Sequence, residues 1–191
     1  MSGGKRIVAV AGLPGSGKST VAKLLGPPVI SMGDVVRREV RKRGLREDLE
    51  NVMKIARELR RERGAGAVAE LVLDELRRIE SKLVVVEGVR SSAELDVLAR
   101  EAECIKVVAV HASPETRFER LRGRGRAGDP RSWEEFVRRD AAELEFGVSE
   151  VIALADVMIV NESTLEELSR SVERAREVLE ECSGRYAWRS R

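Results

Sequence analysis

Aromatic residues are scarce in this sequence of 191 residues and make up only 3% of it. A protein that stacks the bases of a single-stranded nucleic acid needs aromatic side chains interleaved with basic ones. The net charge is also only +2, which excludes a uniformly basic surface for nucleic acid. Any basic binding function must therefore be local.

Cysteines and long apolar runs are also few. The two cysteines, Cys104 and Cys182, match no metal-ligand spacing, and we expect two thiols, with a disulfide as the alternative. No run approaches the roughly 18 apolar residues that a membrane helix needs. The first six residues, MSGGKR, do not lead into the apolar stretch of a secretory signal. We therefore expect a cytoplasmic protein that does not engage a membrane.

Arginine, in contrast, is abundant: only seven of the 35 basic residues are lysine. Its planar guanidinium binds phosphate through two parallel hydrogen bonds, so the composition suits recognition of phosphate groups. Hydrophobic residues make up 42% of the chain, enough for a folded core. We expect one domain over residues 1–182 and a C-terminal tail over residues 183–191.

Short apolar, β-branched runs alternate with longer segments of helical pattern. Such runs are typical of buried parallel strands, and parallel neighbours need crossover connections. The sequence therefore predicts an α/β fold with a mainly parallel sheet. The five predicted strands are Lys5–Ala11, Val29–Ser31, residues 83–86, residues 105–110 and Val157–Val160.

Capping patterns locate several helices. Ser163 and Glu166 form a capping box before an apolar face that continues to Leu179. Ser132 and Glu135 form a second box, which starts a helix expected to reach Asp140. Ser113 followed by proline is a third helix start. The pattern of residues 34–80 predicts two or three charged helices between the second and third strands.

A phosphate-binding motif follows the first predicted strand directly and precedes a helical run. Its glycines let backbone N–H groups turn inward toward phosphate oxygens, and the following helix N-terminus favours an anion. Lys18 is placed to reach the β- and γ-phosphates, the Ser19 hydroxyl to bind Mg²⁺, and Thr20 to donate to phosphate. A glycine-rich turn that matches by chance is the alternative, but the flanking strand and helix are the context that the motif requires. The motif is Gly12, Leu13, Pro14, Gly15, Ser16, Gly17, Lys18 and Ser19.

The nucleotide is predicted to be ATP, with Mg²⁺ as the metal. GTP-binding switches usually carry an Asn-Lys-x-Asp segment that reads guanine, and this sequence lacks it.

Three further segments resemble known kinases. Ile-Ser-Met-Gly-Asp-Val-Val-Arg at residues 30–37 and Glu-Gly-Val-Arg at residues 87–90 resemble nucleoside monophosphate kinases, whose phosphate loop the motif also resembles. Residues 155–161, with the leucine-rich segment after them, look more like dephospho-CoA kinases. From residue 5 to about 180 the chain is most similar to an archaeal group of adenylate-kinase-related P-loop proteins. It departs from the usual pattern at Met32, at Glu87 and in lacking a proline before Arg90.

The resemblance implies a three-layer P-loop kinase fold with a five-stranded parallel sheet in the order 2-3-1-4-5. It implies an acceptor-binding helical insert at residues 34–80 and a short lid at residues 122–131. Arg37 and Arg90 stand where the relatives bind the acceptor phosphate. The alternative for each is a structural or solvated arginine.

Two carboxylates have more than one interpretation. Glu87 ends an apolar strand, where it could orient water on Mg²⁺, accept a proton from a hydroxyl acceptor, or simply cap a helix or form an ion pair. Asp34 contacts the acceptor, serves as a base, or caps the following helix.

The segment from Arg117 to Asp140 is rich in arginine, which can stabilise the transferred phosphate or stack on adenine. We expect Arg122 to bind ATP, and Arg126 and Arg139 to act in catalysis. A basic patch for RNA is the alternative. Asn161 is expected to border the adenine, or to belong to a plain turn.

Together these patterns predict an ATP-dependent phosphotransferase whose acceptor is a nucleotide or a nucleotide-like small molecule. Phosphorylation of a hydroxyl, as in dephospho-CoA kinases, is one alternative, and a nucleotide-gated ATPase that associates with RNA is another. We expect a monomer or a small homo-oligomer.

Overall fold

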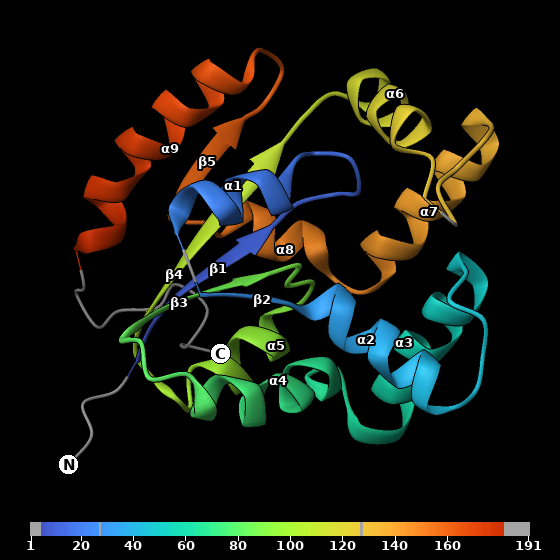
Figure 1. Cartoon of the computed structure of the whole chain (residues 1–191), viewed down its shortest axis with the longest axis horizontal. Coiled ribbons are helices and arrows are strands. Elements are labelled where there is room, and N and C mark those ends of the chain that lie inside the picture. Colours follow the sequence, from blue (N-terminus) through green and yellow to red (C-terminus); the bar gives the residue numbers. More distant parts are fainter. Residues whose placement is uncertain (1–4, 27, 127, 182–191) are drawn as a thin grey trace.

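The computed structural model describes residues 5–26, 28–126 and 128–181. Five strands form one sheet in the order β2-β3-β1-β4-β5, and every neighbouring pair is parallel (Figure 1). This order confirms the predicted topology. The strands are β1 (Lys5–Ala11), β2 (Val29–Ser31), β3 (Leu83–Glu87), β4 (Ala102–His111) and β5 (Val157–Val160).

Helices cover both faces of the sheet, and the three central strands β1, β3 and β4 are therefore buried on both sides along most of their length. Helices α1 and α9 pack on one face, and α4, α5 and α8 cover the other (Figure 1). The helices are α1 (Lys18–Leu25), α2 (Met32–Lys42), α3 (Leu49–Arg63), α4 (Ala67–Arg78), α5 (Ser92–Leu98), α6 (Pro114–Arg124), α7 (Trp133–Glu145), α8 (Val148–Ala153) and α9 (Leu165–Glu180).

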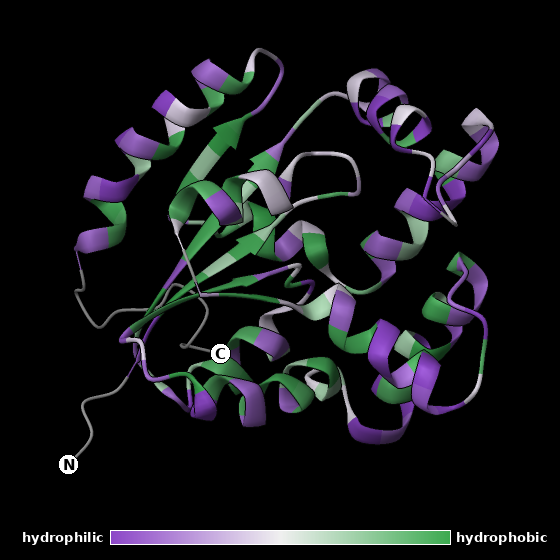
Figure 2. Ribbon diagram, viewed as in Figure 1, coloured by the Kyte–Doolittle hydropathy of each residue, from purple (hydrophilic) through white to green (hydrophobic). Residues whose placement is uncertain are grey.

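Alternation along β1 divides the core into two clusters. Ile7 and Ala9 point toward the α4–α5 layer, whereas Val8 and Val10 point toward α1 and α9. Helix α9 accordingly has an apolar face toward the sheet and a hydrophilic outer face (Figure 2). The three layers thus follow from the alternation of side chains along the strands and from the single apolar face of the covering helices.

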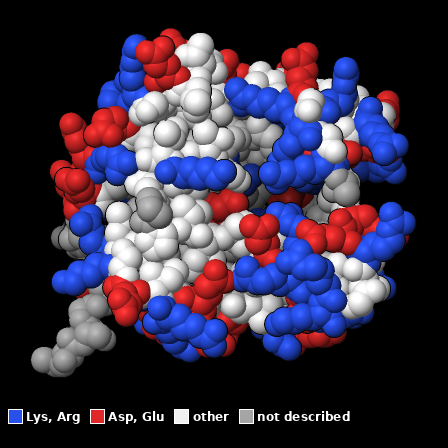
Figure 3. Space-filling model, viewed as in Figure 1, with Lys and Arg blue, Asp and Glu red and all other residues white. Residues whose placement is uncertain are grey.

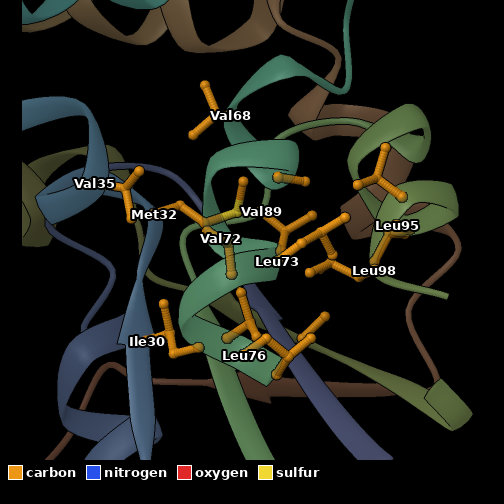
Figure 4. Close-up of a cluster of buried hydrophobic side chains, with 14 of the residues drawn as sticks. Ile30, Met32, Val35, Val68, Val72, Leu73, Leu76, Val89, Leu95 and Leu98 are labelled. Carbon is orange, nitrogen blue, oxygen red and sulfur yellow. The ribbon is translucent and has the colours of Figure 1, made fainter. Parts of the chain in front are cut away.

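The larger cluster is built around α4. Val72 and Leu76 project from this helix between Ile30 of β2 and Leu98 of α5 (Figure 4). Met32 lies in the same cluster and is fully buried, so the methionine that replaces the usual threonine packs in the core. The predicted insert at residues 34–80, which includes α4, therefore packs into the core.

Several boundaries differ from the predicted ones. Helix α7 continues to Glu145 instead of ending at Asp140, and Thr164, not Ser163, caps α9 by accepting from the Glu167 N–H. The short helices α5 and α8 were not predicted, because six or seven residues show too little periodicity to distinguish a helix from a turn.

The expectation of two thiols is wrong, because Cys104 is disulfide-bonded. Cys182 and the predicted tail at residues 183–191 lie outside the described residues. Within the described ranges, no helix combines the length and apolar character that a membrane crossing needs.

The position of α4 in the core gives a stability prediction. Leu76→Ala should lower the free energy of unfolding by about 2–5 kcal/mol, because it removes buried methyl groups and leaves a cavity. Leu165→Ala is the matched control, since Leu165 is 65% exposed, and should change it by less than about 0.5 kcal/mol. Urea unfolding measures both, and equal effects would contradict this account of the core.

Candidate functional site

The phosphate loop joins β1 to α1 at the carboxyl end of the central strand. Gly15 and Gly17 have φ values of +83° and +96°, which turn the backbone inward before the helix begins. A Cβ atom on Gly15 would lie 2.6 Å from the Arg117 carbonyl oxygen. The loop conformation therefore requires glycine both for its backbone angles and for its close packing.

Arg117 holds this loop from the side of α6. Its side chain is only 4% exposed and donates from Nη1 to the Pro14 carbonyl at 3.2 Å and from Nε to the Ala112 carbonyl at 3.1 Å. Asp140 of α7 accepts from both Nη atoms, at 2.8 and 2.6 Å. The loop, α6 and α7 are thus joined through one guanidinium.

Asn161 supports the loop from the other side. Its side-chain Nδ2 donates to the Ser16 carbonyl at 2.8 Å, and its backbone N–H donates to the His111 carbonyl at 2.8 Å. The Asn161 carbonyl accepts from Arg120 at 3.0 Å. Asn161 is buried against the loop, and its expected place beside an adenine remains a prediction.

Two groups of the loop are suited to an anion. Burial lowers the pKa of Lys18 to about 8, although Glu143 and Glu87 oppose this effect. The Lys18 ammonium donates to the Leu13 carbonyl at 3.0 Å. The Ser16 hydroxyl is buried and has no hydrogen-bond partner among the described residues. A phosphate would supply both a negative charge and acceptor oxygens here.

Ser19 and Glu87 form the candidate metal position. Strands β1 and β3 are neighbours, and this places the Ser19 hydroxyl 3.2 Å from a Glu87 carboxylate oxygen, to which it donates. Across the described ranges, no group of three or more His, Cys, Asp or Glu could hold a metal ion. The pair fits Mg²⁺, which binds through one or two protein oxygens and takes its other ligands from water and phosphate.

A cleft of about 740 Å³ opens from the loop toward α2 and α3. Figure 3 shows the hollow between the α6–α7 part and the α2–α3 part, with acidic side chains in it and basic ones around it. The cleft brings together most of the predicted site residues. Those that line it are Pro14, Gly15, Gly17, Lys18, Ser19, Thr20, Asp34, Arg37, Glu87, Arg90, Arg126 and Arg139.

The predicted lid residues are divided between two places. Arg126 and Arg139 line the large cleft, whereas Arg122 lies over the Phe118 ring, 5.7 Å from its centroid, beside a smaller pocket of about 270 Å³. The connection between α6 and α7 is held by Asp129, which accepts from Arg124 and from Arg139. Burial opposes ionisation of Asp129, but these two arginines lower its pKa.

Each arginine expected to bind the acceptor is already paired with a carboxylate. Arg37 donates to Asp34 at 2.8 Å, and Arg90 donates through Nη2 to Glu143 at 3.2 Å and also through Nε. Ser31, not Asp34, caps α2, because its hydroxyl accepts from the Asp34 N–H at 3.3 Å. The helix-capping role considered for Asp34 is therefore wrong.

Sequence reasoning missed Glu143 and the supporting roles of Arg117 and Arg120. A helical period continued past Asp140 would have brought Glu143 to the same side of α7 as Arg139, four residues earlier. No local pattern signals Arg117, whose partners come from three separate segments.

Comparison with known proteins agrees with this geometry. The sheet and loop define a P-loop domain of the kinase type, and the family model described as "AAA domain" matches residues 8–145. The chain belongs to the UPF0200 protein family, with 50% identity over 178 residues to a member from Hyperthermus butylicus that covers 91% of this chain and 95% of that protein. A UPF0200 protein from Pyrococcus abyssi is 47% identical over 174 residues, covering 87% of this chain and 93% of that one.

Solved structures share the fold. TT1252 from Thermus thermophilus is 25% identical and superposes with a TM-score of 0.64, covering 91% of this chain and 97% of that chain. Shikimate kinase from Bacteroides thetaiotaomicron is 22% identical, with a TM-score of 0.55 and coverage of 93% and 99%. This second likeness concerns the fold alone.

The role of Arg117 gives a second stability prediction. Arg117→Met keeps much of the side-chain volume but leaves Asp140 without its partner, and should lower the free energy of unfolding by about 3–5 kcal/mol. Exposed Arg138 on α7 is the matched control, and Arg138→Met should have little effect. Urea unfolding compares them, and a mild effect of Arg117→Met would rule out its supporting role.

Proposed function

We propose that this protein transfers the γ-phosphoryl group of ATP to a small molecule bound in the same cleft. The observation that carries this proposal is the placement of Lys18 and the Ser19–Glu87 pair at one end of a cleft that continues well beyond the loop. A triphosphate on the loop would direct its terminal phosphate toward Arg90 and the α2–α3 side. The remaining space suits a second ligand.

Each part of the site has a role in this reaction. The loop backbone and Lys18 hold the β- and γ-phosphates, and Arg126 and Arg139 neutralise charge on the transferred group. Mg²⁺ on Ser19, with Glu87 orienting its water ligands, would neutralise charge between the β- and γ-phosphates. Asp34, Arg37 and Arg90 position the acceptor. Catalysis then depends on positioning and charge neutralisation more than on covalent chemistry.

We further propose a nucleotide or nucleotide-like acceptor. Support comes from the likeness of residues 30–37 and 87–90 to nucleoside monophosphate kinases, and from the position of Asp34, Arg37 and Arg90 on one side of the cleft. The structural neighbours include shikimate kinases, whose likeness concerns the fold alone.

The direct test combines binding with product detection. Lys18→Ala should weaken binding of a non-hydrolysable ATP analogue with Mg²⁺ by about 100-fold, because a charge-assisted contact to phosphate is lost in a partly buried site. Isothermal titration calorimetry measures it, with exposed Lys54→Ala as the matched control. Phosphorus NMR of reactions with candidate acceptors then identifies the product. Unchanged binding by Lys18→Ala would overturn the proposal.

The lowered pKa of Lys18 predicts how ATP affinity depends on pH. A bound triphosphate should return this pKa from about 8 toward its ordinary value of 10.5, so binding takes up a fraction of a proton that grows as the pH rises through 8. Affinity should be nearly constant below pH 7, fall by about twofold between pH 7 and 8, and then fall more steeply, approaching about tenfold per pH unit toward pH 10. Lys18→Arg keeps its charge over this range and should show a flat profile. A flat profile for the unmodified protein would contradict the assignment.

A further inference from the structure

Glu143 lies where the acceptor's phosphate would be expected. Its carboxylate comes from α7 and pairs with Arg90 through both oxygens, at the end of β3. The Glu143 side chain is 8% exposed and that of Arg90 is 22% exposed, yet both line the cleft. An acceptor phosphate bound to Arg90 would have to displace this carboxylate or lie against it.

The surroundings keep Glu143 ionised. Burial alone would raise its pKa, but Arg90, Lys18 and Arg139 together lower it. Arg90 is itself held from behind, because its backbone N–H donates to Glu94 at 2.7 Å and the fully buried Glu94 also pairs with Arg60. This chain of ion pairs leaves Arg90 little freedom to leave Glu143 for another anion.

The charged residues that line the cleft form two regions, a mainly basic one at the loop and a mainly acidic one around Arg90. Around the loop and the lid, six basic residues face two acidic ones: Lys18, Lys23, Arg120, Arg124, Arg126 and Arg139 against Glu87, which lies beside Ser19, and Asp129. Around Arg90 and the α2–α3 side, four acidic residues face two basic ones: Asp34, Glu47, Asp48 and Glu143 against Arg37 and Arg90. The first region suits a triphosphate. The second disfavours a further phosphate, because like charges in a partly desolvated site repel strongly.

We propose that the group phosphorylated by this protein is a hydroxyl, and that Glu143, held by Arg90, accepts its hydrogen bond and then its proton. This deepens the proposed function and rests on it. The acceptor is therefore a hydroxyl-bearing, nucleotide-like molecule with no phosphate at Arg90. Two lone pairs of the Glu143 carboxylate remain for the hydroxyl after Arg90 has used the others.

The reaction balances without a further reactant. The acceptor's hydroxyl oxygen forms a bond to the γ-phosphorus while the bond from that phosphorus to the β–γ bridging oxygen breaks. ADP leaves with the bridging oxygen, and the hydroxyl proton passes to Glu143 and then to water. The products are a phosphate monoester, ADP and one proton.

Water serves as the simplest hydroxyl acceptor, so hydrolysis of ATP tests the catalytic role. Glu143→Gln keeps the shape of the side chain but cannot take the proton, and should lower kcat for ATP hydrolysis by about 100-fold. The KM for ATP should change by less than about threefold, because Glu143 lies beyond the triphosphate. Glu143→Asp should recover part of the rate. Glu145→Gln is the matched control on the same helix, since Glu145 is 63% exposed and pairs with Arg57.

Nucleoside monophosphates test the choice of acceptor. With Mg-ATP, the unmodified protein should form no nucleoside diphosphate from AMP, CMP, GMP or UMP. Glu143→Gln releases Arg90 and should bind AMP about tenfold more tightly when loaded with the ATP analogue. Such a gain cannot arise from partial unfolding, which only weakens binding.

The possible failures are distinguishable. Formation of a nucleoside diphosphate by the unmodified protein, or full hydrolysis by Glu143→Gln, would overturn the hydroxyl proposal and leave the phosphotransferase proposal standing. Failure of the unmodified protein to bind the ATP analogue would overturn the phosphotransferase proposal itself.

Discussion

The inward turn of the phosphate loop is the constraint on which the rest of the site depends. Backbone N–H groups that point at one place create an anion site only if the turn is held there in the absence of the anion. Arg117 and Asn161 hold it from opposite sides, each through a carbonyl of the loop. Both lie just beyond the carboxyl ends of β4 and β5, the edge of a parallel sheet at which ligands bind.

The second constraint is charge compensation inside the cleft. Several buried or half-buried arginines are paired with a carboxylate on another element, as in Arg90 with Glu143 and Arg60 with Glu94. Such pairs contribute little net stability, because desolvation cancels much of their attraction. Their effect is to fix the positions of charged groups before any ligand arrives.

Local patterns in the sequence were sufficient for the sheet and the loop. Apolar runs identified all five strands, and the resemblance to kinases supplied their order. The positions of Ser19 and Glu87 side by side follow from neighbouring parallel strands that end at one edge. Short elements such as α5 and α8 could not be predicted, because tertiary packing, not periodicity, decides them.

Ion pairs and hydrogen bonds between residues far apart in the chain were the other feature of the site that the sequence could not predict. Asp34 and Glu143 are both carboxylates near an arginine in the cleft, but only Asp34 is close to its arginine in sequence. Glu143 meets Arg90 from 53 positions away in the sequence, and this depends on how α7 crosses the end of β3. Arg117 likewise carries no local signal, since one of its partners is 103 positions away. The arginines were visible in the sequence, but whether each was free to bind phosphate was not.

Helix α7 connects the two ends of the cleft. Arg139 and Glu143 lie one turn apart on it, the first joined to the lid through Asp129 and the second to the acceptor side through Arg90. Gly128 of the lid lies against the start of α3, where an added Cβ would come within 2.7 Å of Leu49. One helix thus carries both the ion pair to the α6–α7 connection and the ion pair to Arg90, and it fixes the spacing between them.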